Sequence, residues 1–443
     1  MTRLFLPHRM FDELAAGCGG SEAGRFLASA ARGRHLLLLR AVADEAGTGS
    51  VRDSFRALAA LYETAPDRVD PVLRYPAVGA WALATLRSLR EGRKARPERM
   101  AALAAAAAVR ADTPFEIRVP ADEDGVMLPS LGRVLSREPA PGPGATRSGA
   151  AERGREPEWW PVHVEPAGAW AEGDHGRVDI PADPTRDAPG WQGLRTITAG
   201  HPDGPLRLVV DDLDPYRFPP GDIQASRLSE AEVAAWTALF QDAWTILRTH
   251  HAAMADEIRT LLSVVTPLSP SGWPTSGTSR TTFGCVALAR PGDPLSPAAT
   301  LVHEAQHAKL SELFHLVDLV SPDAEARYYA PWRHDARPIT GLLHGTYAHL
   351  GVADFWRRQR HVSGGEAAHA EFVRWREAAA DTARVIRGTS ALTPVGHRFV
   401  DGMVRTLDTL RAEPAPDEAA ELANRAAEEH RRRYGRWSRP RRV

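Results

Sequence analysis

A helical pattern of apolar residues runs through most of this 443-residue chain and limits what it can fold into. From residue 296 to the end, apolar side chains recur at intervals of three and four residues, as on the buried face of an amphipathic helix. The same spacing occurs between residues 21 and 100 and again from residue 228 to 262, and the almost pure alanine run 101–109 also favours a helix. The pattern predicts a mainly α-helical protein.

Short segments between these helical stretches alternate apolar and polar residues, which is typical of half-buried strands. The first is Phe115 to Val119, and the others lie at 161–164, 176–180, 194–198 and 206–210. We expect the later strands to form a small sheet that pairs with those before residue 136. The predicted fold class is therefore mainly α with a minor β-sheet, or α+β.

One segment rich in proline and glycine divides the chain. Residues 136–158 read SREPAPGPGATRSGAAERGREPE and have nothing apolar to bury, so we predict a linker or long surface loop over 136–160. This boundary leaves a helical region ending in strands at 1–135 and a small β region at 161–226. The mainly helical remainder, 227–443, is the region in which we expect the metal-binding chemistry described below.

Charge and composition exclude several classes of protein. The 55 Lys and Arg residues nearly balance the 56 Asp and Glu residues, which argues against a protein that binds nucleic acid through its overall charge. No window approaches the ~18 uninterrupted apolar residues of a membrane span. The first residues meet charge and proline too early for a signal peptide. We therefore expect a cytoplasmic protein with neither nucleic acid nor a membrane as partner.

Histidine is the main candidate for metal chemistry. The two cysteines, Cys18 and Cys285, cannot supply a thiolate zinc cage or a disulfide framework. Within a predicted helix, His303, Glu304 and His307 form the motif His-Glu-x-x-His. Residues four apart lie on one face of a helix, so both imidazoles can bind one metal ion. Glu304 is rotated by about 100° from His303 and stays free to transfer a proton or orient a ligand. The plainer alternative is a helix with two ordinary histidines.

A catalytic metal needs a third ligand downstream of this motif. Leu310 and Leu313 stand where the metzincin pattern requires glycine and histidine, which excludes that class. Glu325 lies near the spacing at which gluzincins place a glutamate ligand. The residues around Glu325 are typical of a loop or a helix start, so a surface carboxylate is the plainer interpretation.

Two further candidates lie in the apolar helical segment 339–356, where an embedded histidine needs a polar partner. His344 and His349 are five residues apart and are rotated by about 140° from each other, so they do not easily face the same metal ion. Small residues next to His344 allow another helix to approach closely. We therefore favour His344 as the third ligand, with His349 and Glu325 as the alternatives.

Residues 327–337 are dense in aromatic side chains and arginines. Such a loop is costly to order unless it packs over something. The planar fork of an arginine is suited to hold a carboxylate of a substrate or cosubstrate, and Arg327, Arg333 and Arg337 are the candidates. For any one of them, a structural role in a loop packed by aromatic residues is the plainer alternative.

Taken together, these segments resemble the HExxH-motif peptide-modification proteins that are associated with radical-SAM peptide natural-product clusters. The likeness is carried by residues 303–307, 327–333, 335–338 and 341–356, and also by 11–17, 35–40 and 211–216. It covers most of the chain except the segment 136–158 and the basic C-terminal tail.

The resemblance implies an iron(II)- and 2-oxoglutarate-dependent oxygenase that hydroxylates the β-carbon of a side chain in a ribosomally made precursor peptide. It also implies a fold unlike the usual double-stranded β-helix of such enzymes, and a radical SAM enzyme of the same pathway as a further partner. His303 and His307 carry over as metal ligands. His344 and the three arginines carry over as the third ligand and the cofactor-binding residues.

The residues alone leave the metal open, because imidazole suits both zinc and iron. With iron, three protein ligands would leave positions for the 2-oxoacid and dioxygen. Glu304 would not bind the metal itself but would orient the groups that do. With zinc, Glu304 would take a proton from the water that the metal activates, and the protein would be a metallopeptidase that cleaves a precursor or leader peptide. A peptide-binding scaffold without catalysis is the third possibility. In each case we predict that the motif helix packs against the helix at 341–356.

Overall fold

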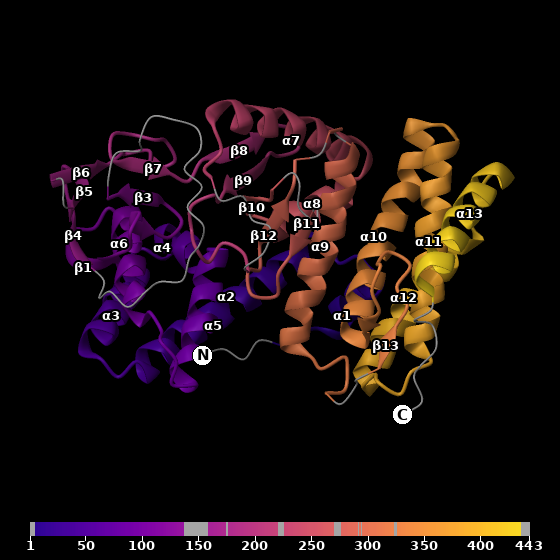
Figure 1. Ribbon diagram of the computed structural model, residues 1–443, viewed down its shortest axis with the longest axis horizontal. Coiled ribbons are helices and arrows are strands. Elements are labelled where there is room, and N and C mark those ends of the chain that lie inside the picture. The colour runs from indigo at the N-terminus through magenta and orange to yellow at the C-terminus, as the bar shows by residue number, and fades with distance from the viewer. Residues whose placement is uncertain are drawn as a thin grey trace.

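The computed structural model describes residues 5–136, 158–173, 176–219, 226–269, 276–290, 292–293, 295–322 and 326–435 (Figure 1). Helices hold 58% of the residues and strands 17%, in small sheets without a closed barrel, which confirms the predicted fold class. Most of the predicted linker, residues 137–157, and Glu325 lie outside the described residues. Among the described helices, none is long and apolar enough to cross a membrane.

Six helices form the N-terminal part of the chain. They are α1 (His8–Ala15), α2 (Gly20–Glu45), α3 (Gly49–Thr64), α4 (Pro66–Leu73), α5 (Pro76–Arg90) and α6 (Met100–Ala111), with a 3₁₀ turn, η1 (Pro97–Arg99), before α6. Proline starts both α4 and α5, where its missing N–H costs no hydrogen bond. Helix α6 is almost all alanine and is buried from residue 100 to 108. Its small side chains let α3, α4 and strand β1 pack closely around it.

Two small antiparallel sheets lie at one end of the molecule (Figure 1). The first has the order β1-β4-β5-β6, with β1 (Phe115–Ala121), β4 (Glu158–Glu165), β5 (Gly168–Gly173) and β6 (Gly176–Ile180). The second has the order β2-β3-β7, with β2 (Gly125–Leu128), β3 (Gly132–Leu135) and β7 (Trp191–Gly193). Strand β1 pairs with β4 from Phe115 opposite Val164 to Ala121 opposite Glu158. This pairing confirms that strands on either side of the predicted linker share a sheet. The strands predicted at 194–198 and 206–210 do not join it, because they belong to a separate five-stranded sheet.

A five-stranded sheet lies in the middle of the molecule and has the order β11-β12-β10-β9-β8. Its strands are β8 (Thr196–Ala199), β9 (Leu206–Val210), β10 (Val264–Pro267), β11 (Ser276–Thr278) and β12 (Cys285–Leu288). Strands β9, β10 and β12 are parallel, whereas β8 and β11 are antiparallel to their neighbours. Strand β11 is the edge strand on one side, and it packs against helix α9.

The C-terminal half is mainly helical; besides strands β10 to β12 it contains the two-stranded ribbon of β13 (Arg327–Tyr328) and β14 (Arg337–Pro338). Its helices are α7 (Glu230–His250), α8 (Ala252–Leu261), α9 (Leu295–Leu316), α10 (Ile339–Ser363), α11 (Glu366–Arg387), α12 (Pro394–Ala412) and α13 (Asp417–Tyr434). Helix α9 carries the motif and packs along α10, as predicted (Figure 1). The pattern from 228 to 262 is not one helix, because the chain bends at His251, whose buried Nε2 bonds to the Gln359 amide.

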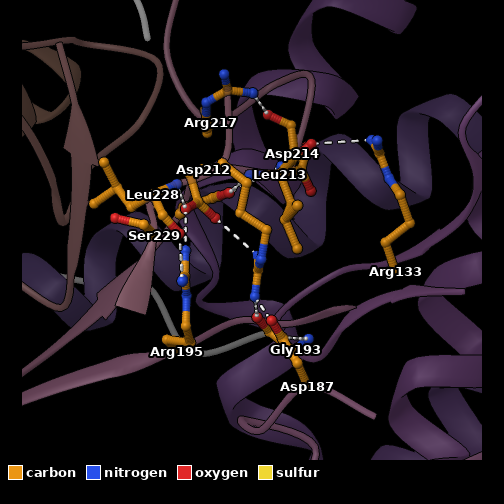
Figure 2. Close-up of polar contacts among 12 residues, drawn as sticks. Arg133, Asp187, Gly193, Arg195, Asp212, Leu213, Asp214, Arg217, Leu228 and Ser229 are labelled. Atoms are coloured by element: carbon orange, nitrogen blue, oxygen red, sulfur yellow. Dashed lines mark hydrogen bonds and ion pairs between the residues drawn. The ribbon is translucent and has the colours of Figure 1, made fainter. Parts of the chain in front are cut away.

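The segment 211–216, one of those that carry the family resemblance, is a buried ion-pair network that joins two sheets (Figure 2). The Asp212 carboxylate accepts hydrogen bonds from Arg195, which directly precedes β8 of the five-stranded sheet, and from Arg227. The neighbouring Asp214 accepts one from Arg99, and the Leu213 carbonyl accepts one from Arg133 of β3. None of these residues lines the cavity at the motif histidines, so their contacts indicate a role in the fold.

Candidate metal centre

The motif histidines meet on the face of α9 that is turned toward α10. The Nε2 atoms of His303 and His307 lie 3.1 Å apart, and one imidazole can donate a hydrogen bond to the other at this distance. Two nitrogens that share one metal ion at about 2.1 Å also lie roughly 3.0–3.4 Å apart. The pair is therefore spaced as two neighbouring ligands of one ion would be.

Helix α10 brings both of its candidate histidines to this pair. The ring centroid of His349 lies 5.0 Å from that of His303, and the centroid of His344 lies 5.6 Å from that of His307. Imidazoles that share a metal ion at ordinary bond lengths place their centroids about 5 Å apart. The pairing also shows that α9 and α10 run antiparallel. His344 and His349 therefore lie on either side of the motif pair, each beside a different motif histidine.

His349 is the more firmly held of the two. Its ring packs between the indoles of Trp332 and Trp375, with centroids 4.4 Å from each. Its Nδ1 donates a hydrogen bond of 2.8 Å to the Gly345 carbonyl, which leaves the lone pair on Nε2. Metal-bound histidines usually have such a backbone contact on the other ring nitrogen. Side chains of a helix lean toward its N-terminus, so His349 leans back to the level of the motif pair.

His344 differs in its surroundings. Its ring stacks on Phe314, with centroids 5.3 Å apart, and its Nε2 is buried without a hydrogen-bond partner among the described residues. By the same rule of direction, its side chain leans away from the level of His303. The assignment of His344 as third ligand stays a prediction. The structure makes His349, which is five residues farther along the chain, at least an equal candidate.

The described residues do not yet hold a completed metal site. No group of three or more His, Cys, Asp or Glu side chains in the described part of the chain has its donor atoms gathered for one ion. The orphaned Nε2 of His344 and the open Nε2 of His349 are both donors of the type that iron and zinc accept.

Glu304 is buried beside the pair and is held by the edge strand. Its Oε1 accepts a hydrogen bond of 2.8 Å from the Ser276 hydroxyl, and the Thr278 hydroxyl also bonds to its carboxyl group. Its Oε2 has no partner among the described residues. Burial raises the pKa of Glu304 to about 7, against the opposing effect of these two hydroxyls. The carboxyl group can therefore gain or lose a proton near neutral pH.

One cavity of about 660 Å³ contains this whole arrangement. The four histidines and Glu304 line it together with Trp332, Trp375 and four arginines, which are Arg280, Arg333, Arg337 and Arg374. Two of the three predicted arginines, Arg333 and Arg337, thus reach the cavity, although both pair with Asp335, at 3.0 and 3.2 Å. The third, Arg327, does not line the cavity. Its guanidinium donates to the Ala336 carbonyl and so closes the loop between β13 and β14.

Arg280 is the arginine that sequence reasoning missed. It follows β11, lies 5.3 Å from the Phe314 ring centroid, and forms no ion pair with any carboxylate in the described ranges. Burial lowers the pKa of His344, and the charge of Arg280 adds to this effect. No motif marks Arg280, because only the packing of β11 on α9 brings it to the histidines. Among the arginines of this cavity, it is the one whose charge is most available to a ligand.

The histidines of the site are neutral when no metal is bound. Burial lowers the pKa of His303 and His344 to about 4, and it lowers those of His307 and His349 well below the usual 6.5. His35 of α2, which is buried against α5 and away from this site, has its pKa lowered to about 4 for the same reason. Neutral imidazole is the form that binds metal ions.

These shifts predict that the metal-free protein loses stability on acidification. Between pH 6.5 and about 4 the unfolded chain binds protons that the buried imidazoles cannot, so the free energy of unfolding falls by about 1.4 kcal/mol per pH unit for each such histidine. Urea unfolding from pH 7.5 to 4.5 measures the slope. His35→Asn, which keeps a donor for the Leu73 carbonyl, should reduce the slope, and His250→Gln on the surface should not. Stability that is constant or rises toward pH 4.5 would contradict the prediction.

Comparison with known proteins adds no assignment to this geometry. No protein-family model matches the chain, and no curated protein sequence matches it. The family resemblance noted from the sequence therefore stays a prediction, and the site geometry carries the functional argument.

Proposed function

We propose that this protein is an iron(II)- and 2-oxoglutarate-dependent oxygenase that hydroxylates a side-chain β-carbon of a ribosomally made peptide. The observation that carries the proposal is that one cavity holds both the motif histidines and four arginines. The imidazoles suit a divalent metal, and the guanidinium groups suit a dicarboxylate cosubstrate beside it.

The metal would be held by His303, His307 and an imidazole of α10, for which we favour His349. Bound there, iron(II) would supply the redox chemistry in which dioxygen is reduced and 2-oxoglutarate is decarboxylated to succinate. The protein residues position the reactants. Glu304, fixed by Ser276, would accept or donate one hydrogen bond at its open Oε2 toward the metal ligands. The Trp332 and Trp375 rings hold the His349 imidazole and exclude water from one side of it.

Arg280 would bind the carboxylate of the 2-oxoacid that lies farther from the metal. Its guanidinium is the one in this cavity without a carboxylate partner among the described residues. Arg333 and Arg337 are already joined through Asp335, and Arg374 pairs with Glu371 at 3.4 Å. These three arginines make the wall of the cavity positive, but the guanidinium group of each already pairs with a carboxylate.

The peptide would reach the site from a second cavity of about 390 Å³, which shares His303, His349, Ser276 and Trp375 with the first. Its wall combines the apolar side chains Leu295, Val352 and Trp356 with two carboxylates, Asp293 and Glu371, and none of the described arginines lines it. The apolar part of this wall suits a side chain that must be held away from water near an oxidant. The cosubstrate and the peptide would thus approach the histidines from two different sides.

One observation favours a zinc metallopeptidase as the second candidate. Glu304 is buried, has a pKa near 7 and carries an open Oε2, as a general base for peptide hydrolysis would. A peptidase, however, has no need for four arginines in the metal cavity. We therefore rank it behind the oxygenase.

The test is an assay of the iron-loaded protein with 2-oxoglutarate, dioxygen and the precursor peptide. We expect one succinate and one carbon dioxide for each oxygen atom added to the peptide. The zinc-loaded protein, incubated with the same peptide without 2-oxoglutarate, tests the alternative by mass spectrometry of cleavage products. Cleavage of the peptide without any gain of oxygen would place the zinc metallopeptidase ahead of the oxygenase.

Binding of the cosubstrate can be measured apart from turnover. We expect Arg280→Gln to weaken 2-oxoglutarate binding to the metal-loaded, oxygen-free protein by about 10- to 100-fold, since a charge-assisted pair to a carboxylate is lost. Calorimetry measures the affinity, and Arg327→Gln, outside the cavity, is the matched control. Equal affinity for the wild type and Arg280→Gln would reject the role of Arg280. No binding by the wild type would reject the proposed function itself.

A further inference from the structure

A second site lies away from the histidines, in a cavity of about 300 Å³ between α2, α8 and the amino ends of β10 and β12. Five arginines line it, and no aspartate or glutamate among the described residues does. They are Arg32, Arg74, Arg110, Arg207 and Arg259. We propose that this arginine cavity binds a small anion that carries two or more negative charges on phosphate or carboxylate oxygens. The proposal is independent of the metal centre.

The strongest observation concerns Arg110 at the end of α6. Its Nε donates to the Ser130 hydroxyl at 3.0 Å and its Nη2 to the Ser130 carbonyl at 2.7 Å. Neither partner is charged, and no described carboxylate forms an ion pair with Arg110. Burial lowers the pKa of this guanidinium. A half-buried cation that lacks a counter-charge is costly, so an anion in the cavity would stabilise it.

Two other arginines, Arg32 and Arg74, are oriented by one aspartate that lies outside the cavity. Asp70 accepts a hydrogen bond from Arg32 Nη1 at 3.0 Å and pairs with Arg74 Nε at 2.6 Å. Asp70 itself lines the adjoining cavity and not this one. One carboxylate thus orients two guanidinium groups and neutralises one of their two charges. Each keeps further N–H groups for a ligand, because a guanidinium has five.

The remaining two arginines complete the wall. Arg207 projects from β9 on the same side as Val209, and it forms no ion pair with any residue that the structure describes. Arg259 of α8 makes only a long contact of 3.7 Å with Asp256. The cavity therefore faces its ligand with several charges that are not neutralised. A monovalent anion would leave most of them unpaired, whereas a multivalent oxyanion matches the arginine forks.

The test uses the full-length, metal-free protein and two probes, inorganic pyrophosphate for phosphate oxygens and citrate for carboxylate oxygens. Calorimetry at fixed ionic strength measures binding to the wild type, Arg110→Gln and Arg207→Gln. Arg110→Gln alone is not sufficient because it can impair folding, so the exposed Arg207 provides the second variant. Arg405→Gln, an exposed arginine on α12, is the matched control.

We expect the wild type to bind at least one probe with one ligand per chain, and the tighter probe identifies the oxygen chemistry. Arg207→Gln and folded Arg110→Gln should each weaken binding by about tenfold or more, and Arg405→Gln should not. Arg280→Gln should leave this binding unchanged, which separates the arginine cavity from the metal centre. No binding of either probe at millimolar concentration, or equal weakening by Arg405→Gln, would overturn the proposal.

Discussion

His303→Ala and His307→Ala should each abolish tight metal binding while the chain stays folded. The two Nε2 atoms lie 3.1 Å apart, so each variant removes one of two imidazoles that the fold holds at the spacing expected of ligands to one ion. Loss of a residue that only orients a ligand costs 10- to 100-fold in metal affinity, and loss of a ligand itself should cost more than about 100-fold. Anaerobic titration with iron(II), zinc and cobalt(II) measures the affinity, and circular dichroism checks the fold.

The helix α10 variants decide the third ligand. We expect His349→Ala to lose more than about 100-fold in metal affinity and His344→Ala to lose no more than about tenfold. The reverse order would assign His344 instead and would restore the interpretation from the sequence. His250→Ala, on the surface at the end of α7, is the control for loss of a histidine. If both motif variants bind metal as the wild type does, the metal centre is rejected. A peptide-binding scaffold without catalysis would then be the favoured interpretation.

The pairing of α9 with α10 could be predicted from the sequence, because both segments are apolar and contain histidines that need partners. The motif itself predicted that His303 and His307 meet, since helix geometry is local. Which α10 histidine approaches them depends on helix direction and register, which apolar spacing does not determine. The structure places both beside the pair, with ring centroids 5.6 Å apart for His344 and His307 and 5.0 Å apart for His349 and His303.

Arg280 and Lys309 show why the rest of the site could not be predicted. Arg280 reaches the cavity because the edge strand β11 packs on α9, a contact between segments that no periodicity connects. Lys309, two residues after the motif, would be taken for a solvated lysine in any helix pattern. In the structure it is among the most buried side chains of the molecule, with 1% of its surface exposed. Charged groups buried by long-range packing leave little trace in composition or spacing.

Lys309→Met should destabilise the protein by about 3–5 kcal/mol, because it leaves a buried carboxylate without its cation. The Lys309 ammonium donates to Glu257 Oε2 at 2.7 Å and to the Gly17 carbonyl at 3.0 Å. Glu257 Oε1 in turn accepts from the Gly20 backbone N–H at 2.8 Å. The pair thus ties α8 and α9 to the turn between α1 and α2. Urea unfolding of the metal-free protein at neutral pH measures the loss.

The double variant Lys309→Met/Glu257→Gln separates the pair from the packing around it. It should be less destabilised than the sum of the two single variants, because the uncompensated charge is removed together with its partner. Arg40→Met breaks an exposed pair with Asp44 at 2.8 Å and should cost less than about 1 kcal/mol. Two outcomes would show that this buried pair does not hold α9 in place. One is that Lys309→Met lowers the free energy of unfolding by less than Arg40→Met does. The other is that the losses of the two single variants add up exactly in the double variant. In that case the position of the motif helix would depend on its other contacts with α2, α7, α8, α10 and β11.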